Sequence, residues 1–187
     1  MGVRSNDHQR VSGKQYFEHE VQNAGNTGST IGSGFTAATY QSSLEINGNL
    51  AKWTIWIDIA GSVSKNTDGD IIGTDDTANA HIGQIPSGVT WLGGKVTCLE
   101  APTTGEPDLN LYEAVEGTLA EDSAIGDGTE TILLDRNGDW AINDIKSLSA
   151  APTAGEYLYL SVGTNSSPTA GTYDAGIFLM EFYGTQS

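Results

Sequence analysis

Basic residues, cysteine and long apolar runs are scarce in this 187-residue chain, and each shortage excludes a class of protein. Eight Lys and Arg stand against 24 Asp and Glu, so the net charge of −16 opposes binding to nucleic-acid phosphates. The single cysteine, Cys98, excludes an intramolecular disulfide framework. No apolar run approaches the ~20 residues of a membrane helix, and residues 1–15 lack the apolar segment of a secretory signal. We therefore expect neither a nucleic-acid partner nor a membrane.

Charged residues of either sign are also sparse, at only 17% of the chain, whereas glycine is common, with 24 residues. The surface must then consist mainly of Ser, Thr, Asn and Gly with acids laid over it. Such surfaces are common on β-rich proteins, since threonine fits a pleated sheet and glycine supplies turns.

Apolar and polar residues alternate along several segments, which is the pattern of half-buried strands. In residues 51–60, Trp53, Ile55 and Ile57 share one face, whereas Trp56 and Asp58 share the other. The same alternation recurs in residues 109–116, 157–162 and 176–184, and further strand candidates are residues 35–45, 80–85, 89–92, 95–100 and 129–135.

Turn residues separate these segments. Asn47-Gly48 and Asn137-Gly138 predict hairpins with type I′ turns, which need positive φ at their central positions. A Pro-Thr-X-Gly sequence occurs at Pro102, Pro152 and Pro168, each time before an apolar run. We interpret it as a turn preset by proline and released by glycine, because the spacing is too uneven for a repeat architecture.

One stretch favours a helix, since Ile142, Ile145 and Leu148 recur every three residues, enough for one or two turns. Eight to ten strands in one domain predict an all-β protein, an antiparallel β-sandwich of jelly-roll type. We assign this sandwich to residues 35–187.

Residues 1–34 differ from the remainder and predict an extended N-terminal arm. They hold three of the eight bases, Arg4, Arg10 and Lys14, a short strand-like patch that includes Tyr16 and Phe17, and a glycine-rich stretch. The arm is either a disordered terminus or a segment that orders on a neighbouring subunit, in which case these five residues bind the partner. Residues 100–144 carry twelve acids and one base, so a comparatively basic arm could dock on an acidic body.

Catalytic signatures are weak. A hydrolase triad would have to use His81, since His8 and His19 lie in the arm, and no Gly-x-Ser-x-Gly motif accompanies it. Cys98 alternates with Val96 and is expected to be a small buried hydrophobe. We therefore predict a protein that is not an enzyme, with a β-sandwich glycosidase or lyase as a remote alternative.

Two kinds of ligand remain open. Acid-rich loops at residues 66–70, 75–76 and 135–139 offer the hard oxygen ligands that Ca²⁺ prefers. Each loop is equally compatible with an ordinary turn. We therefore predict no cofactor and keep Ca²⁺ as a lesser alternative. Trp56 beside Asp58 suits sugar stacking, with Trp53, Trp91 and Trp140 as further candidate platforms.

Residues 85–105 (IPSGVTWLGGKVTCLEAPTTG) and the strand endings at residues 151–163 and 167–184 resemble small structural proteins of tailed-bacteriophage virions. The resemblance is to capsid decoration (cement) proteins and head or tail accessory β-sandwiches, and it covers about residues 85–184. It implies a non-enzymatic protein of the virion surface, made in the host cytoplasm, that binds the major capsid protein and often forms a homotrimer. The alternative function is a carbohydrate-binding or host-recognition module.

Overall fold

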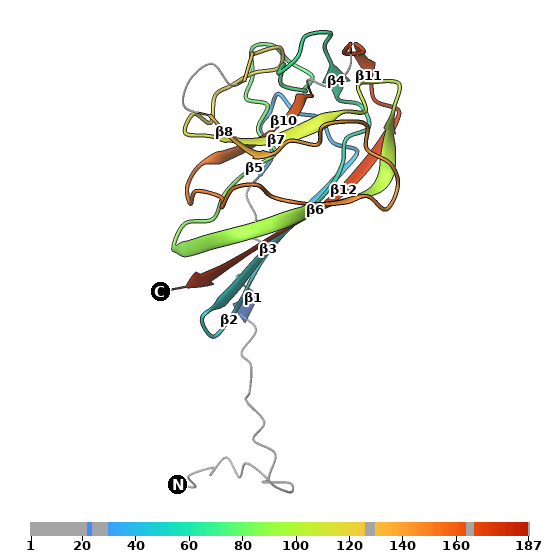
Figure 1. Ribbon diagram of the computed structural model, residues 1–187. Coiled ribbons are helices and arrows are strands. Elements are labelled where there is room, and N and C mark those ends of the chain that lie inside the picture. The colour runs from blue at the N-terminus through green and yellow to red at the C-terminus, as the bar shows by residue number, and fades with distance from the viewer. Residues whose placement is uncertain (1–21, 24–29, 126–129, 164–166, 187) are drawn as a thin grey trace, which may run out of the picture.

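The computed structural model describes residues 22–23, 30–125, 130–163 and 167–186, and their regular structure is entirely β-strand (Figure 1). The predicted all-β class and antiparallel sandwich are confirmed, since two antiparallel sheets enclose a shared core. The finer prediction of a jelly-roll topology stays a prediction. Within these residues no helix is long and apolar enough to cross a membrane.

The largest sheet has six strands in the order β1-β2-β3-β12-β6-β9, and the sheet facing it has four in the order β5-β10-β7-β8. A small pair, β11-β4, lies at the upper end of the molecule in Figure 1. The strands are β1 (Gln22–Asn23), β2 (Thr39–Asn47), β3 (Leu50–Asp58), β4 (Val63–Ser64), β5 (Gly83–Gln84), β6 (Val89–Thr103), β7 (Leu109–Ala114), β8 (Thr131–Leu134), β9 (Ile145–Ser147), β10 (Tyr157–Val162), β11 (Gly171–Thr172) and β12 (Ala175–Gln186).

Alternation along β3 and β12 builds one wall of the core. Their inward residues are fully buried and meet in register as the pairs Trp53–Phe182, Ile55–Met180 and Ile57–Phe178. The Trp53 and Phe182 rings stack with centroids 4.8 Å apart. Burial of each such side chain contributes about 1.5–3 kcal/mol, so these pairs fix the register that also sets the outward-facing residues.

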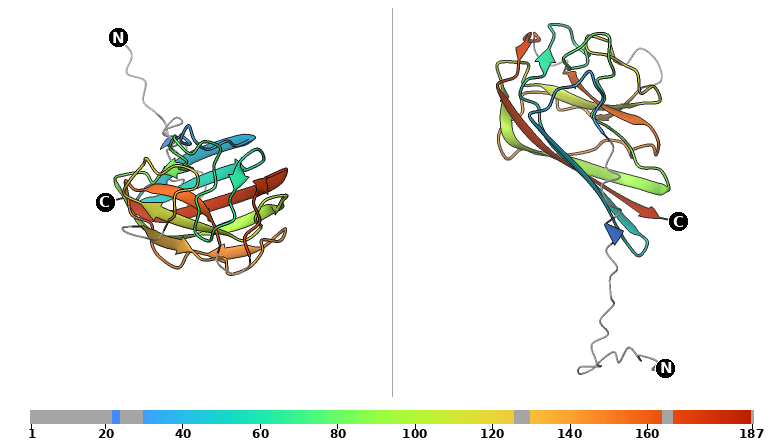
Figure 2. Two further views of the ribbon diagram at one scale, coloured as in Figure 1. Left: turned by 90° about the horizontal axis from the view of Figure 1, so that it is seen from above. Right: turned by 180° about the vertical axis from the view of Figure 1, so that it is seen from behind.

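The second wall comes from β7 and β10, whose buried Leu109, Leu111, Leu158 and Leu160 join the same core. Views from above and behind show the two sheets as layers, with the longest strands in the larger one (Figure 2). Cys98 is fully buried in this core, as its alternation with Val96 predicted.

The two Asn-Gly turns behave differently. Asn47 pairs with Leu50 across a two-residue loop, so the first hairpin forms, but only Gly48 of that loop has positive φ (59°), which is typical of a type II′ turn. The hairpin predicted at Asn137-Gly138 is wrong. β8 pairs only with β7 among the described strands, because the chain after Gly138 turns inward to bury Trp140, whose Nε1 donates to the Leu109 carbonyl at 2.9 Å.

The helix predicted across residues 140–148 is also wrong. Asn143 has a φ of 69°, which a right-handed helix does not allow, and Ile145–Ser147 forms edge strand β9 on β6. Ile142 and Ile145 are 61% and 60% exposed, so the threefold spacing does not mark a buried face.

The N-terminal residues that the structure describes contact the sandwich. β1 pairs with the end of β2, and Gly32 and Gly34 donate backbone hydrogen bonds of 2.7 Å to His81 and Asn79. A Cβ atom at Gly32 would collide with the Asn79 carbonyl, so this approach requires glycine. The boundary expected between residues 34 and 35 stays a prediction. The partner-binding residues predicted in the arm, Arg4, Arg10, Lys14, Tyr16 and Phe17, lie outside the described residues.

Candidate interaction surface

The outer face of the six-stranded sheet carries a charged centre. Glu181 on β12 accepts from Lys52 at 2.6 Å and from Lys95 at 2.9 Å, which joins strands β3, β12 and β6 through side chains. The hydrogen bond from Lys52, with the charge of both lysines, lowers the pKa of Glu181 to about 2 although burial opposes it. The pKa values of both lysines are raised in return, first by the same hydrogen bonds.

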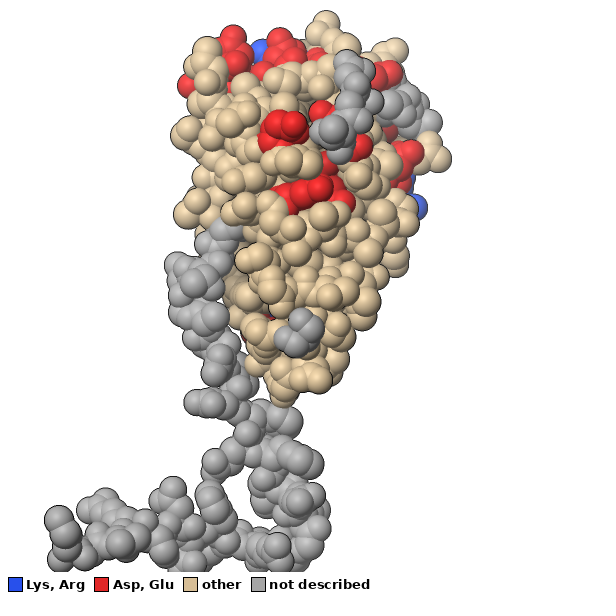
Figure 3. All heavy atoms as spheres, turned by 90° about the vertical axis from the view of Figure 1, so that its left-hand side faces the viewer, with Lys and Arg blue, Asp and Glu red and all other residues tan. Residues whose placement is uncertain are grey.

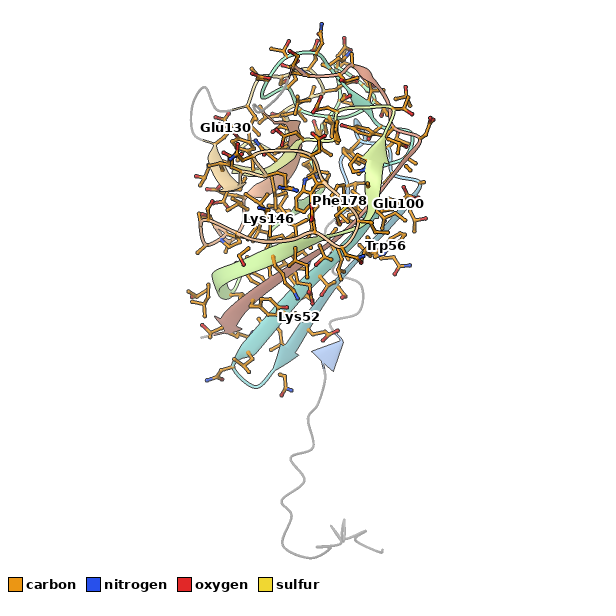
Figure 4. The ribbon with its side chains drawn as sticks, turned by 45° about the vertical axis from the view of Figure 1, so that its right-hand side comes forward. Lys52, Trp56, Glu100, Glu130, Lys146 and Phe178 are labelled. Carbon is orange, nitrogen blue, oxygen red and sulfur yellow. The ribbon has the colours of Figure 1, made fainter. Side chains whose placement is uncertain are left out.

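Trp56 lies on this outer face, in register with Gln41 on one side and Leu179 on the other (Figure 4). The sequence correctly places Trp56 and Asp58 on the face opposite Trp53. Asp58 is partly engaged, because its Oδ1 accepts from the Ala60 N–H at 3.0 Å and closes the turn after β3.

The other three tryptophans serve the core. Trp53, Trp91 and Trp140 are 0–4% exposed, and each indole N–H donates to a partner within the protein. A stacking role for these three is therefore wrong, because no ligand can reach their rings. Trp56 is left as the tryptophan that can present its ring.

Three described segments at one end of the molecule contain no charged side chain, and we call this region the uncharged end. It comprises residues 84–94, 147–155 and 184–186, none of which is acidic or basic. Hydrogen bonds from Gly155 to Ile85 and from Leu148 to Gly94 hold the first two segments together, and β12 pairs beside β6. Figure 3, which faces the side where β6 begins, shows carboxylates over the upper part and almost none below.

The uncharged end includes an open sheet edge. β9 covers only Lys95–Thr97 of β6, so among the described residues no strand lies beside Val89–Gly93 on that edge. Leu92 in this stretch is 66% exposed. Tyr183 and Leu50, on neighbouring strands, are 42% and 66% exposed. Unpaired backbone groups beside exposed apolar side chains are features of a surface that can bind another chain.

His81 and Cys98 have surroundings unsuited to catalysis. Burial raises the pKa of the Cys98 thiol to about 11, and its S–H donates to the Glu100 carbonyl at 3.3 Å. His81 is half-buried against the rings of Tyr157 and Tyr159, and burial lowers its pKa. Among the described residues, neither side chain has a contact that would activate it as a nucleophile or base.

Buried glutamates hold the Pro-Thr turns, a role that the sequence did not reveal. Glu113 accepts from the Thr153 N–H at 2.7 Å and its hydroxyl at 3.0 Å, and Glu106 accepts from the Thr169 N–H at 2.6 Å. Both glutamates are 1% exposed. Since each glutamate precedes its turn by 40 residues or more, sequence spacing offers no signal for the pairing.

The three acid-rich loops differ in how far their carboxylates are satisfied. Asp75 accepts from the Thr77 N–H and hydroxyl at 2.8 and 2.6 Å, and Asp135 accepts from the Asn137 N–H at 3.1 Å. These two acids cap their own turns. Within the described parts of the chain, no group of three or more His, Cys, Asp or Glu residues is arranged to hold a metal.

Comparison with known proteins adds no relative: no family model, curated protein or solved structure matches this chain.

Proposed function

We propose that this chain is a non-enzymatic structural protein that decorates the outer surface of a tailed-phage capsid and links neighbouring subunits. The observation that supports it is the segregation of charge. In an acidic chain with a net charge of −16, the described segments 84–94, 147–155 and 184–186 have no charged side chains, and they include the open β6 edge and Leu92.

Charge decides which surface can associate. Two copies of so acidic a chain repel one another, and the repulsion acts over a Debye length of ~8 Å at physiological salt. At the uncharged end this repulsion is weakest, and burial of Leu92 against a partner removes apolar surface from water. Exposed apolar area contributes about 25 cal/mol per Å² when buried.

The N-terminal segment reaches the sheet at the same end. Gln22 pairs with Ile46, next to the turn that follows Asn47, and Leu50 after that turn is in register with Thr185 and Thr90. In the proposed function, the chain that precedes Gln22 leaves from this end toward the capsid or a sister subunit. Linked contacts of arm and sheet edge would raise the overall affinity beyond that of either contact.

The test compares lysine substitutions at two exposed apolar positions. Leu92→Lys places a charge on the open edge, whereas Val115→Lys is the matched control, since Val115 is 59% exposed and follows β7 in the acidic body. We expect the wild type and Val115→Lys to form trimers of about 59 kDa, three times the chain mass of 19.6 kDa. Leu92→Lys should shift toward the monomer.

Capsid binding is measured separately, by co-sedimentation with shells of the major capsid protein. Deletion of residues 1–21 should abolish binding and leave the sandwich folded, because the contacts of Gly32 and Gly34 with Asn79 and His81 remain. Full occupancy by both the deletion variant and Leu92→Lys would refute the proposed function.

A second function is supported by Trp56 alone. Its partly exposed ring lies between Gln41 and Leu179, with Asp58 on the same face, which suits a carbohydrate-binding or host-recognition module. Here a glycan array with the wild type and Trp56→Ala decides. Binding that Trp56→Ala loses would favour this function, and an empty array with no change in tryptophan fluorescence would exclude it.

A further inference from the structure

Asp70 is a buried carboxylate that lacks a full set of partners. Its side chain belongs to a residue that is 4% exposed, and its Oδ2 atom has no hydrogen-bond partner among the described residues. Thr67 donates to the Asp70 carboxylate through its side chain and its backbone, but unlike Asp75 and Asp135, which are exposed and capped, Asp70 keeps a buried oxygen without a partner. A buried polar atom without a partner requires an explanation, and an ion is one that supplies charge as well as contacts.

A second carboxylate is brought to Asp70 from 52 residues further along the chain. The Asp122 N–H donates to the Ile71 carbonyl at 3.1 Å, and the Ile71 N–H donates to the Ser123 carbonyl at 3.1 Å. Asp70 itself forms a bridge with Ala124, which makes Asp122 its diagonal neighbour. The side chains of Asp70 and Asp122 lie within hydrogen-bond reach of each other.

The backbone around Asp70 is held from both sides. The Val162 N–H donates to the Asp70 carbonyl at 2.9 Å, and the Gly69 N–H donates to the Val162 carbonyl at 3.0 Å. On the other side, the Ile125 N–H donates to the Gly69 carbonyl at 3.0 Å. Asp70 therefore cannot turn out toward solvent without breaking a ladder that spans three segments of the chain.

The lysine near this pair of acids, Lys65, already forms an ion pair. Lys65 pairs with Glu121 at 3.2 Å, and Glu121 is the residue before Asp122. The charge of Lys65 acts on Glu121, Asp122 and Asp76, and its closest partner is Glu121. The carboxylates of Asp70 and Asp122 keep an excess of negative charge, which a bound cation would compensate.

We propose that Asp70 and Asp122 form a binding site for a hard divalent cation, with Ca²⁺ preferred over Mg²⁺. The buried Oδ2 of Asp70 supplies one ligand, Asp122 supplies a second from the exposed side, and water completes the shell. Ca²⁺ accepts irregular sets of oxygen ligands, whereas Mg²⁺ requires near-ideal octahedral geometry. This site lies at the acidic end and is independent of the capsid role proposed above.

Calorimetric titration of the full chain with CaCl₂ and with MgCl₂, after removal of metals by EDTA, tests the site. We expect one Ca²⁺ per chain and a higher melting temperature with Ca²⁺ than with EDTA. Asp70→Asn and Asp122→Asn should each weaken Ca²⁺ binding by at least about tenfold and remove the thermal shift. Asp139→Asn, in the acid-rich loop at residues 135–139, is the matched control and should retain affinity within about twofold.

Two other results would overturn the proposal. If Ca²⁺ neither binds nor raises the melting temperature of the wild type, while Asp70→Asn is more stable than the wild type in EDTA, the two carboxyls share a proton and not a cation. If only Asp139→Asn loses binding, the cation belongs to the other loop. Because Asp122 is exposed, Asp122→Asn keeps the test valid even if the buried Asp70→Asn does not fold.

Discussion

Glu181 should make the free energy of unfolding depend on pH, and the substitution Glu181→Gln should remove this dependence. Its carboxylate binds Lys52 and Lys95, and the hydrogen bond from Lys52 leads the effects that hold its pKa at about 2, below the ordinary 4.5. A folded-state pKa below the unfolded one contributes stability that is fully present above pH ~4.5 and is lost as the pH falls toward 2.

The magnitude follows from the pKa. At about 1.4 kcal/mol for each tenfold change in proton affinity, a pKa of about 2 in place of 4.5 corresponds to about 3 kcal/mol at pH 7. Solvent screens the two partly exposed lysines, so we expect Glu181→Gln to lower the free energy of unfolding by about 2–3 kcal/mol at pH 7. At pH 3 the loss should be only about 1 kcal/mol, because the ionised carboxylate of Glu181 then contributes less to the stability of the wild type.

Urea unfolding of wild type and Glu181→Gln at pH 7 and pH 3 measures this difference. Glu100→Gln is the control, since Glu100 is exposed and lies on the adjacent strand β6 without an ion pair among the described residues. A loss that is equal at the two pH values would show that Glu181 stabilises through packing and not through its charge, and would refute the reasoning. A similar loss in Glu100→Gln would refute it as well.

Three further predictions concern the interior. Glu113→Ala leaves the backbone N–H and hydroxyl of Thr153 without their acceptor and should cost about 2–3 kcal/mol in urea unfolding, whereas an unchanged midpoint would contradict the anchoring role. Cys98, with a pKa of about 11, should not react with a thiol reagent at pH 8 until the protein unfolds, and rapid labelling of the native chain would contradict its burial. Gly105→Ala would bring a Cβ atom to 2.6 Å from the Tyr173 ring and should lower stability by about 1–3 kcal/mol; a higher melting temperature would show that the ring can move aside.

The strand pattern was predictable where alternation and burial coincide. The faces assigned to β3 were correct, with Trp53 inward and Trp56 outward, because a strand on a sandwich has one buried face whatever its neighbours. Alternation predicts separate strands at residues 89–92 and 95–100, divided by Gly93-Gly94, yet both runs belong to one strand, β6. Both glycines pair with β12, which keeps the strand continuous, and local sequence gives no sign of this long-range pairing.

The candidate sites were only partly predictable. Trp56 and Asp58 share a face as expected, since their spacing of two residues on a strand requires it. The uncharged end unites residues 84–94 and 147–155, which are more than 50 residues apart, through hydrogen bonds such as that from Gly155 to Ile85. Likewise, the sequence marks the loop at residues 66–70 as acid-rich but gives no sign of its proximity to Asp122, because the bridge between Asp70 and Ala124 exists only in the folded chain.

The position of β12 has a consequence for how the protein folds. This strand follows every other described strand in the sequence, yet it lies between β3 and β6 near the middle of the six-stranded sheet. During synthesis, β3 and β6 therefore cannot join one sheet until residues 175–186 have left the ribosome. Until then, the apolar faces of both strands stay exposed. Such long-range pairing slows folding and exposes strand edges to aggregation, so the yield of native protein should depend strongly on chaperones and on temperature.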